Sequence, residues 1–358
     1  MTPDSTSGAV ADLVRLGQQH SQDRLRARTF NVHGVTTLLL TNSDTMAGAV
    51  SKLLRPFRVE DSSKTDITVH LFAVDDLVED MAPVPAEASL LYDWGMLKIF
   101  HAGQERYLKV DDRARVVADI GQKTAVGFAG QELLFSDWLI SNLFFYPLWA
   151  QLVKESGLFP LHAAGLSRDD KGFLFLGKSG SGKSTLTLNL VRGGYGLLSD
   201  DTVFLRLQQE EDRVRVLSFP EEINVKEETI QLLPELSKVK NFSFNELRGK
   251  SSFSIDELYP GCVVESSIPR VLVFPEIADS DATVVEPMSR TEALALSMRY
   301  GFFFLDPSTT ARHFEILSRL AGQAHCYRLY AGRNQEELER VIGSLLNRSG
   351  KAIGEEKE

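Results

Sequence analysis

Apolar and polar residues follow two different rhythms along the chain, and these rhythms predict its elements. Residues 29–130 carry short apolar runs separated by turn residues, which is typical of strands. Within them, 32–40 and 65–74 are predicted strands on either side of a helix near 46–54, and a β-meander follows. Residues 1–28 are polar with a sparse apolar stripe and are predicted to form a tail with one helix. A β-rich α+β domain is therefore expected at 29–130.

The segment Glu132–Ser156 is strongly apolar and allows two interpretations. A membrane span is one of them, but Asp137, Asn142 and Pro147 interrupt the apolar run. No uninterrupted stretch reaches the roughly 18 apolar residues that a spanning helix needs. We therefore predict a pair of buried helices at 131–157 that links two domains and crosses no membrane.

Strands and helices continue through residues 158–348, which are predicted to form a second, larger domain of α/β type with a mixed sheet. The apolar run at 269–274 predicts a buried strand. The predicted helices of this domain include 291–300, 308–322 and 335–346. Residues 237–257 are polar and mixed in charge, which is typical either of an acceptor-binding loop or of a mobile surface loop. The tail 349–358 is predicted to be disordered.

Residues 177–184 read GKSGSGKS and fit the phosphate-binding pattern G-x-x-x-x-G-K-[ST]. The pattern gains weight from its surroundings, because it needs a strand before it and a helix after it. Residues 172–176 (GFLFL) form a short apolar run of the buried-strand type. Residues 184–192 have helical length and end at two glycines. The sequence therefore predicts a phosphate-binding loop between a strand and a helix.

The residue types of this loop suit a nucleoside triphosphate with a bound metal ion. Glycines at 177, 180 and 182 are expected to allow positive φ angles and a close approach of the backbone to the ligand. Lys183 is predicted to reach the β- and γ-phosphates, and the Ser184 hydroxyl to bind Mg²⁺. The predicted nucleotide-binding residues are Gly177, Lys178, Ser179, Gly180, Ser181, Gly182, Lys183, Ser184 and Thr185.

A histidine precedes the loop on another predicted strand. Phe159–Leu166 is apolar, and a polar turn joins it to the strand before the loop, which predicts a β-hairpin. If Ser167 pairs with Gly172, a regular antiparallel register places His162 opposite Gly177. His162 is then either a structural histidine or a site residue suited to proton and phosphate chemistry near neutral pH.

Two adjacent aspartates, Asp200 and Asp201, follow the next predicted strand. The distance from Lys183 to Asp200 leaves room only for one helix, one glycine turn and one strand, so both carboxylates are expected beside the phosphates. Two carboxylates at one site can divide two tasks, one near Mg²⁺ and one accepting a hydroxyl proton. An exposed Asp-Asp turn is the alternative.

The stretch from His162 in an LHAAG strand, through GKSGSGKST and a helix closing at Arg-Gly-Gly-Tyr, to LLSDD resembles the catalytic domain of HPr kinase/phosphorylase. The resemblance implies the fold that this family shares with phosphoenolpyruvate carboxykinase, with 158–348 as the catalytic domain. It also implies ATP and Mg²⁺ as cofactors. Catalytic roles pass by resemblance to Asp200, Asp201, His162 and Lys183. Glu221 or Glu222 is the candidate for the acidic residue of the family's later E-x-R-G stretch.

Composition and charge narrow the class of protein further. The chain has 358 residues, of which 43% are hydrophobic and 25% charged, as in ordinary globular proteins. Its formal net charge of -10 weighs against a nucleic-acid partner. Cys262 and Cys326 form no C-x-x-C motif, and the N-terminus shows no signal-peptide pattern, so the cytoplasm is the expected location. The sequence leaves a homo-oligomer open.

Three functions fit these observations. The first is a kinase that moves the γ-phosphoryl group of ATP to a Ser or Thr hydroxyl of a protein or peptide. In it, Asp200 takes the hydroxyl proton, Asp201 and Ser184 hold Mg²⁺, and Lys183 neutralises developing charge. The second is a kinase of a small hydroxylated metabolite that uses the same site. The third is a nucleotide-dependent switch or binding module without phosphotransfer.

Overall fold

The structure is a computed structural model that describes residues 9–21, 24–60, 64–75, 78–245, 249–301, 305–332 and 334–348. The chain divides into two compact units. The first comprises Met1–Gly157 with Phe304–Asp306, and the second comprises Leu158–Phe303 with Pro307–Glu358. Both are built on mixed sheets with helices, so the α/β class predicted from the sequence is confirmed. The predicted disordered tail 349–358 lies outside the described residues.

The described part of the first unit is organised around one nine-stranded mixed sheet of order β3-β1-β2-β4-β9-β8-β7-β6-β5. Strands β2, β4 and β9 run parallel, and the remaining neighbours are antiparallel. Its strands are β1 (Arg26–Val32), β2 (Val35–Thr41), β3 (Arg58–Val59), β4 (Ile67–Ala73), β5 (Ser89–Trp94), β6 (Leu97–Ala102), β7 (Glu105–Val110), β8 (Ala114–Asp119) and β9 (Thr124–Ala129).

The predicted strand 32–40 is wrong in one respect, because the run contains a tight turn. His33 and Gly34 have φ angles of 50° and 86°, in the left-handed region that glycine adopts readily. The chain reverses there, and Val32 pairs with Val35. The apolar run therefore belongs to two antiparallel strands of a hairpin.

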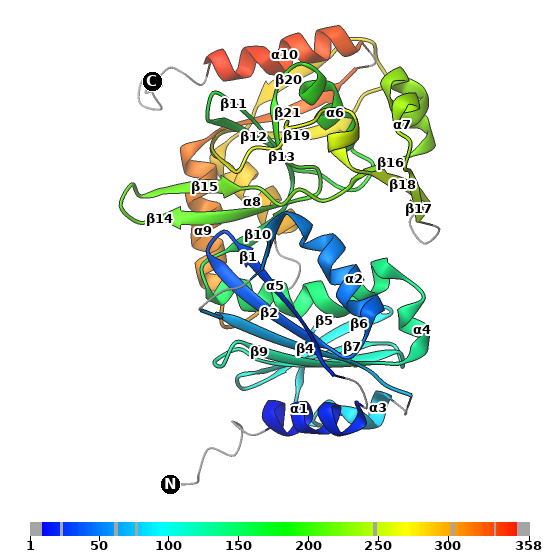
Figure 1. Cartoon of the computed structure of the whole chain (residues 1–358). Helices are drawn as coiled ribbons and strands as arrows, with labels where there is room; N and C mark the ends of the chain where they lie inside the picture. The colour runs from blue at the N-terminus through cyan, green and yellow to red at the C-terminus, as the bar shows by residue number, and fades with distance from the viewer. Residues whose placement is uncertain are drawn as a thin grey trace. The chain divides into compact units, whose positions relative to one another are not determined.

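Helices cover both faces of the first sheet (Figure 1). Helices α1 (Ala9–His20) and α3 (Val78–Met81) lie on one face, where Val10, Phe72 and Phe128 share a core. Helices α2 (Asp44–Leu53) and α5 (Tyr146–Glu155) lie on the other face. The remaining helical segments of this unit are η1 (Arg55–Phe57), α4 (Gln131–Leu134) and the π-helix η2 (Leu139–Phe145).

The segment 131–157, predicted as a link between domains, lies within the first unit. Its helices α4, η2 and α5 are largely buried, and the Trp149 indole donates a hydrogen bond to the Thr37 hydroxyl of β2 at 3.0 Å. Of the helices that the structure describes, not one combines the length and the apolarity required to cross a bilayer. The apolar character of this segment is thus explained by burial against a sheet.

The second unit is built on another mixed sheet, with the path β10-β14-β15-β19-β12-β11-β13 and with β21 and β20 attached beyond β19. Strands β12, β19 and β21 are parallel, and β13 runs in the same direction because both it and β12 are antiparallel to β11. The strands are β10 (Phe159–His162), β11 (Ala164–Arg168), β12 (Lys171–Phe175), β13 (Gly196–Ser199), β14 (Thr202–Gln208), β15 (Arg213–Leu217), β19 (Ser266–Ile277), β20 (Val284–Pro287) and β21 (His325–Ala331).

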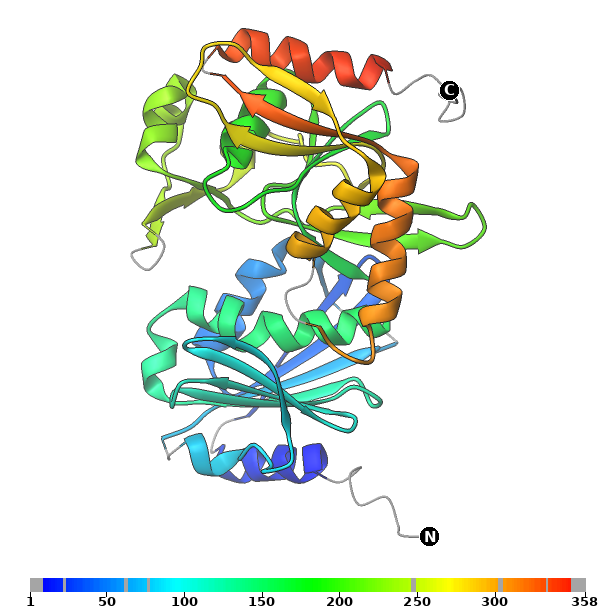
Figure 2. The ribbon, with the colours of Figure 1, turned by 180° about the vertical axis from the view of Figure 1, so that it is seen from behind.

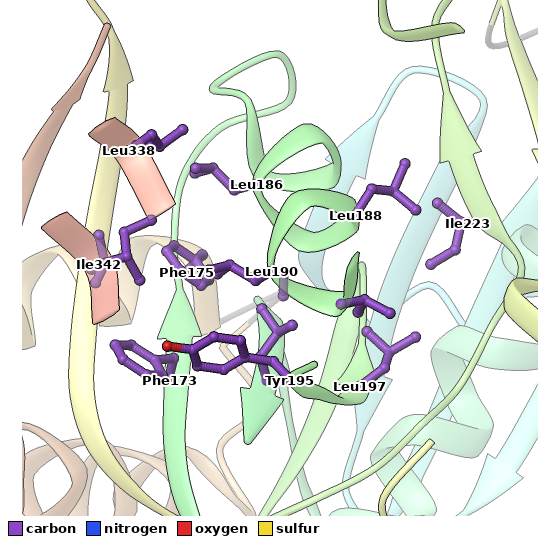
Figure 3. Packing of buried hydrophobic residues seen from close by; sticks show 14 of the residues in the cluster. Phe173, Phe175, Leu186, Leu188, Leu190, Tyr195, Leu197, Ile223, Leu338 and Ile342 are labelled. Carbon is purple, nitrogen blue, oxygen red and sulfur yellow. The ribbon is translucent and has the colours of Figure 1, made fainter. Parts of the chain in front are cut away.

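Four helices cover the two faces of this sheet (Figure 2). They are α6 (Lys183–Arg192) and α10 (Gln335–Arg348) on one face, and α8 (Arg290–Gly301) and α9 (Thr310–Gln323) on the other. Side chains alternate along β12, so that Phe173 and Phe175 pack with Leu186 of α6 and Ile342 of α10 (Figure 3). Leu174 points to the opposite face. Burial on both faces fixes β12, and with it the position at which the loop begins.

Residues between β15 and β19 form a small three-stranded sheet of order β16-β18-β17. Residues 237–257 are therefore partly regular, although the sequence indicated a loop. The strands on either side of Ser218 belong to different sheets, because β15 pairs with β14, whereas β16 pairs with β18. The elements here are β16 (Ile223–Val225), α7 (Glu227–Leu232), η3 (Pro234–Lys238), β17 (Ser243–Asn245), β18 (Lys250–Phe253) and η4 (Ile255–Glu257).

Candidate functional site

The loop between β12 and α6 has the backbone geometry of an anion-binding turn. Gly180 and Gly182 have φ angles of 83° and 92°, which only glycine adopts without strain. Gly177 does not have a positive φ, contrary to the expectation for all three glycines. Its small size is needed for a different reason, because a Cβ atom there would lie 2.6 Å from the Ser181 hydroxyl oxygen. Lys178, Ser179 and Gly180 are exposed at the tip.

Helix α6 begins at Lys183, directly after the left-handed Gly182. The buried Lys183 ammonium donates hydrogen bonds to the carbonyl oxygens of Gly177 at 2.6 Å and Lys178 at 3.3 Å. Burial lowers the pKa of Lys183, while the charges of Asp201 and Asp200 oppose that shift. The lysine is therefore held against the loop backbone, with a cation beside the free N–H groups at the start of the helix.

Asp200 lies next to the loop hydroxyl. The Ser184 Oγ donates a hydrogen bond to Asp200 Oδ2 at 2.8 Å, although the two residues come from α6 and from the end of β13. Asp200 is only 4% exposed, and burial raises the pKa of its carboxyl to about 6, with the nearby charge of Asp201 adding to the shift. The carboxylate thus carries a desolvation penalty that a cation would relieve.

The Asp200 and Ser184 oxygens fit a magnesium ion. Mg²⁺ prefers oxygen ligands and binds through one or two carboxylates together with substrate phosphates and water. Within the described ranges, Asp200 Oδ1 is buried and receives no regular hydrogen bond, and the buried Thr187 hydroxyl lies beside this carboxylate. The same ranges contain no cluster of three or more His, Cys, Asp or Glu side chains that would hold a metal without a ligand. The Asp200 and Ser184 oxygens therefore suit a metal site in which phosphate oxygens supply the remaining ligands.

Asp201 lies next to a histidine. His162 Nδ1 lies 3.4 Å from Asp201 Oδ1, and the two side chains are 39% and 33% exposed. The structure therefore places His162 beside the acidic pair, but through a different strand pairing from the one predicted. Ser167 does pair with Gly172, yet pairing of β11 with β12 stops at Ala164.

His162 belongs to the separate strand β10, where it pairs with Thr202 of β14 rather than lying opposite Gly177. Because Asp201 immediately precedes Thr202, this pairing sets the histidine beside the carboxylate. The expectation of a position opposite Gly177 is thus wrong, and the contact with Asp201 arises from β14.

Several positioning residues were missed by the reasoning from sequence. The buried Ser199 hydroxyl accepts hydrogen bonds from the backbone N–H groups of Asp201 at 3.3 Å and Thr202 at 3.2 Å, and so holds the turn that carries both carboxylates. A serine before Asp-Asp is a recognisable turn signal that could have identified it. The Thr185 hydroxyl lies 3.3 Å from that of Thr229 and joins the first turn of α6 to α7.

A second lysine lies within electrostatic range of the loop. The charge of Lys250, at the start of β18, lowers the pKa of Lys183 in addition to burial. Lys250 directly follows Glu246-Leu247-Arg248-Gly249, which does read E-x-R-G, so the assignment of that acidic position to Glu221 or Glu222 is unnecessary. Residues 246–248 lie outside the described residues. The Glu222 carboxylate accepts a hydrogen bond from Ser252 at 2.7 Å.

Comparison with known proteins gives a likeness to solved structures alone. No family model matches the chain, and no curated protein matches it. Among solved structures, the chain is similar to the HPr(Ser) kinase/phosphatase from Coxiella burnetii, with 15% sequence identity and a TM-score of 0.28. The match covers 53% of this chain and 94% of that chain. A likeness at this TM-score assigns no function to the chain.

Proposed function

We propose that the second unit is an ATP- and Mg²⁺-dependent kinase of the HPr kinase type that transfers the γ-phosphoryl group to a Ser or Thr hydroxyl of a protein or peptide. The main observation behind the proposal is that the two adjacent aspartates have different partners. Asp200 bonds to the loop hydroxyl of Ser184 at 2.8 Å, while Asp201 lies 3.4 Å from His162. A loop that only binds nucleotide needs no second carboxylate paired with a histidine.

This geometry favours an exchange of the two aspartate roles that were expected from the sequence. Ser184 and Asp200 would hold Mg²⁺, because their oxygens already meet and one carboxylate oxygen lacks a regular hydrogen bond among the described residues. When bound, the ion neutralises charge on the β- and γ-phosphates. Lys183 exchanges the loop carbonyls for phosphate oxygens and adds a second positive charge there.

Asp201 would act as the base on the acceptor. In the transfer step the acceptor hydroxyl oxygen forms a bond to the γ-phosphorus, and the bond from that phosphorus to the β–γ bridging oxygen breaks. The hydroxyl proton passes to the Asp201 carboxylate, and ADP leaves. His162, 3.4 Å away, positions this carboxylate. Both side chains are partly exposed, which supports a large acceptor such as a protein segment over a metabolite in a closed pocket.

Transfer is tested directly with γ-labelled ATP, Mg²⁺ and the full chain, using HPr and the products of neighbouring genes as acceptors. Label is expected on a Ser or Thr of one of these proteins. ATP hydrolysis without label on any acceptor would count against the protein-kinase proposal. Cys262 and Cys326 are both free thiols, in keeping with a cytoplasmic acceptor.

The division of roles is tested by comparing Asp200→Asn with Asp201→Asn. The first is expected to raise the Mg²⁺ concentration needed for half-maximal rate by about tenfold or more, since a charged ligand is lost. The second is expected to lower kcat by about 100-fold with an unchanged Mg²⁺ requirement, since a general base contributes on that order. Glu210→Gln, at an exposed acidic residue, serves as the control. The opposite pattern would restore the assignment made from the sequence.

A further inference from the structure

An exposed apolar side chain stands beside the phosphate-binding loop. Ile277, the last residue of β19, is 69% exposed. A Cβ atom built on Gly182 would lie 3.9 Å from Ile277 Cγ1, so the isoleucine borders the glycine that starts α6. Burying such a side chain against an apolar partner is favourable, and the proposed phosphate chemistry makes no use of it. The position therefore points to a part of the ligand other than the phosphates.

The order of the strands places Ile277 and the acidic pair on opposite sides of the loop. β12 ends in the loop, and its neighbour on one side is β11, followed by β13, which ends next to Asp200. Its neighbour on the other side is β19, which ends in Ile277. Because β12, β13 and β19 run in the same direction, all three carboxyl ends lie at one edge of the sheet. Ligands bind at this edge in open α/β sheets.

Charge decides which end of a nucleotide lies on which side. The γ-phosphate must approach Asp201 for transfer, and Ser184 and Asp200 lie on that side with it. The nucleoside is the uncharged, largely apolar end of the same molecule. With the γ-phosphate directed toward β13, the nucleoside leaves the loop in the other direction, past Gly182 and toward Ile277.

The surface around Ile277 is held in place by hydrogen bonds. Ile277 pairs with Ala331 of β21, and the Ala278 N–H donates to the Ala331 carbonyl at 3.0 Å. The Gly332 N–H donates to the Thr283 hydroxyl at 3.2 Å. A Cβ atom on Gly332 would lie 2.4 Å from the Asp281 carbonyl oxygen, so β21 and the residues after β19 are in close contact. The backbone that carries Ile277 is thus held in one position by its neighbours.

We propose that Ile277 forms the nucleoside subsite of this loop, packing against the ribose and base of the bound nucleoside triphosphate. The proposal rests on the function proposed above and adds the part of the site that holds the nucleoside. An isoleucine offers no hydrogen-bonding group, so the contact contributes affinity without selecting among bases. The loop and the isoleucine then bind two ends of one ligand.

The test separates the two ends by comparing ATP with inorganic tripolyphosphate, which lacks a nucleoside. Ile277→Ala is expected to weaken ATP binding by about 3- to 10-fold, the effect of losing part of one apolar contact. Tripolyphosphate binding is expected to stay within about twofold of the unmodified protein, because the loop is unchanged. Val284→Ala is the matched control, because Val284 is also an exposed apolar residue. Its neighbour Val285 packs on the face of the sheet that α6 covers, so the Val284 side chain points to the opposite face. Titration calorimetry with Mg²⁺ measures the affinities of the unmodified protein and of both variants for the two compounds.

Each other result overturns the proposal in a recognisable way. Unchanged ATP affinity in Ile277→Ala shows that the nucleoside lies elsewhere. An equal loss for ATP and tripolyphosphate shows that Ile277 supports the loop and not the nucleoside. If the unmodified protein binds neither compound, the nucleotide site itself is absent, and the proposed function fails together with the subsite.

Discussion

Lys183 shows how the loop accommodates a buried positive charge. Its ammonium lies 2.6 Å from the Gly177 carbonyl oxygen, and its side chain is buried. A buried ammonium needs partners, because an unpaired charge away from water is costly. The carbonyls of Gly177 and Lys178 supply them, and under the proposed function this holds the cation where it can reach the phosphates.

Replacing this lysine is expected to remove phosphotransfer while leaving the loop folded. Lys183→Ala deletes a preorganised positive charge, and the loss of one such group typically costs at least about 100-fold in rate. The turnover number at saturating ATP and Mg²⁺ measures the effect. Lys171→Ala, at the exposed start of β12, is the control and should keep its rate. A Lys183→Ala rate within about threefold of the unmodified protein would contradict a role in charge stabilisation.

At the scale of elements, local sequence patterns predicted the phosphate-binding loop but did not predict the separate strand β10, which carries His162. The β12–loop–α6 unit was predictable because its strand, glycines and helix are contiguous. The break between β10 and β11 could not be predicted, because the alternation of side chains continues through it. The odd-numbered side chains pack into one core and the even-numbered ones into the other: Phe159, Leu161 and Ala163 on one side, Ala164 and Leu166 on the other. A turn sets the register only while two strands remain paired. The pairing of β10 with β14 depends on contacts distant in sequence.

The close packing of β11 against β13 and β14 depends on Gly165. A Cβ atom there would lie 2.8 Å from Val203 Cγ1 and 3.1 Å from Leu198 Cβ, so the strands would have to separate. Gly165→Ala is therefore expected to lower the free energy of unfolding by about 1–3 kcal/mol through overpacking. Gly322→Ala, in the last turn of α9 with open space around it, should instead stabilise by up to about 1 kcal/mol. Calorimetric unfolding of both variants checks the sign; equal shifts would refute the packing argument.

Among the described residues, Arg106 and Asp306 form an ion pair whose two side chains are both buried. Asp306 falls between α8 and α9 in the sequence but belongs to the first unit, where its carboxylate accepts two hydrogen bonds from the Arg106 guanidinium, one of them at 2.8 Å. The two side chains are 3% and 0% exposed. Pairing within the described core thus joins β7 to a segment that arrives late in the chain.

Removing one partner should be far more damaging than removing a surface pair. Asp306→Ala leaves a buried guanidinium without its carboxylate, which typically costs about 3–5 kcal/mol. Asp12→Ala breaks an ion pair with Arg15 in which both side chains are exposed, and it should cost no more than about 1 kcal/mol. All tryptophans of the chain lie in the first unit, at positions 94, 138 and 149, so their fluorescence in urea reports the unfolding of this unit alone. Comparable losses in both variants would contradict the assigned burial.

The pH dependence of the first unit follows from a buried lysine beside the same carboxylate. Burial lowers the pKa of Lys154 from 10.5 to about 8, against the attraction of Asp306 and Glu155. Between pH 8 and 10.5 the unfolded chain therefore binds more protons at this lysine than the folded one, and its contribution to stability rises with pH. Below pH 8 this lysine destabilises the folded unit, and Lys154→Met removes that destabilisation. The free energy of unfolding of the variant should therefore exceed that of the unmodified protein by up to about 3 kcal/mol below pH 8, and the difference should shrink toward pH 10.5. Urea unfolding followed by tryptophan fluorescence at pH 7, 8, 9 and 10 measures the difference. A difference that stays constant over this range would mean that Lys154 keeps its ordinary pKa in the folded unit.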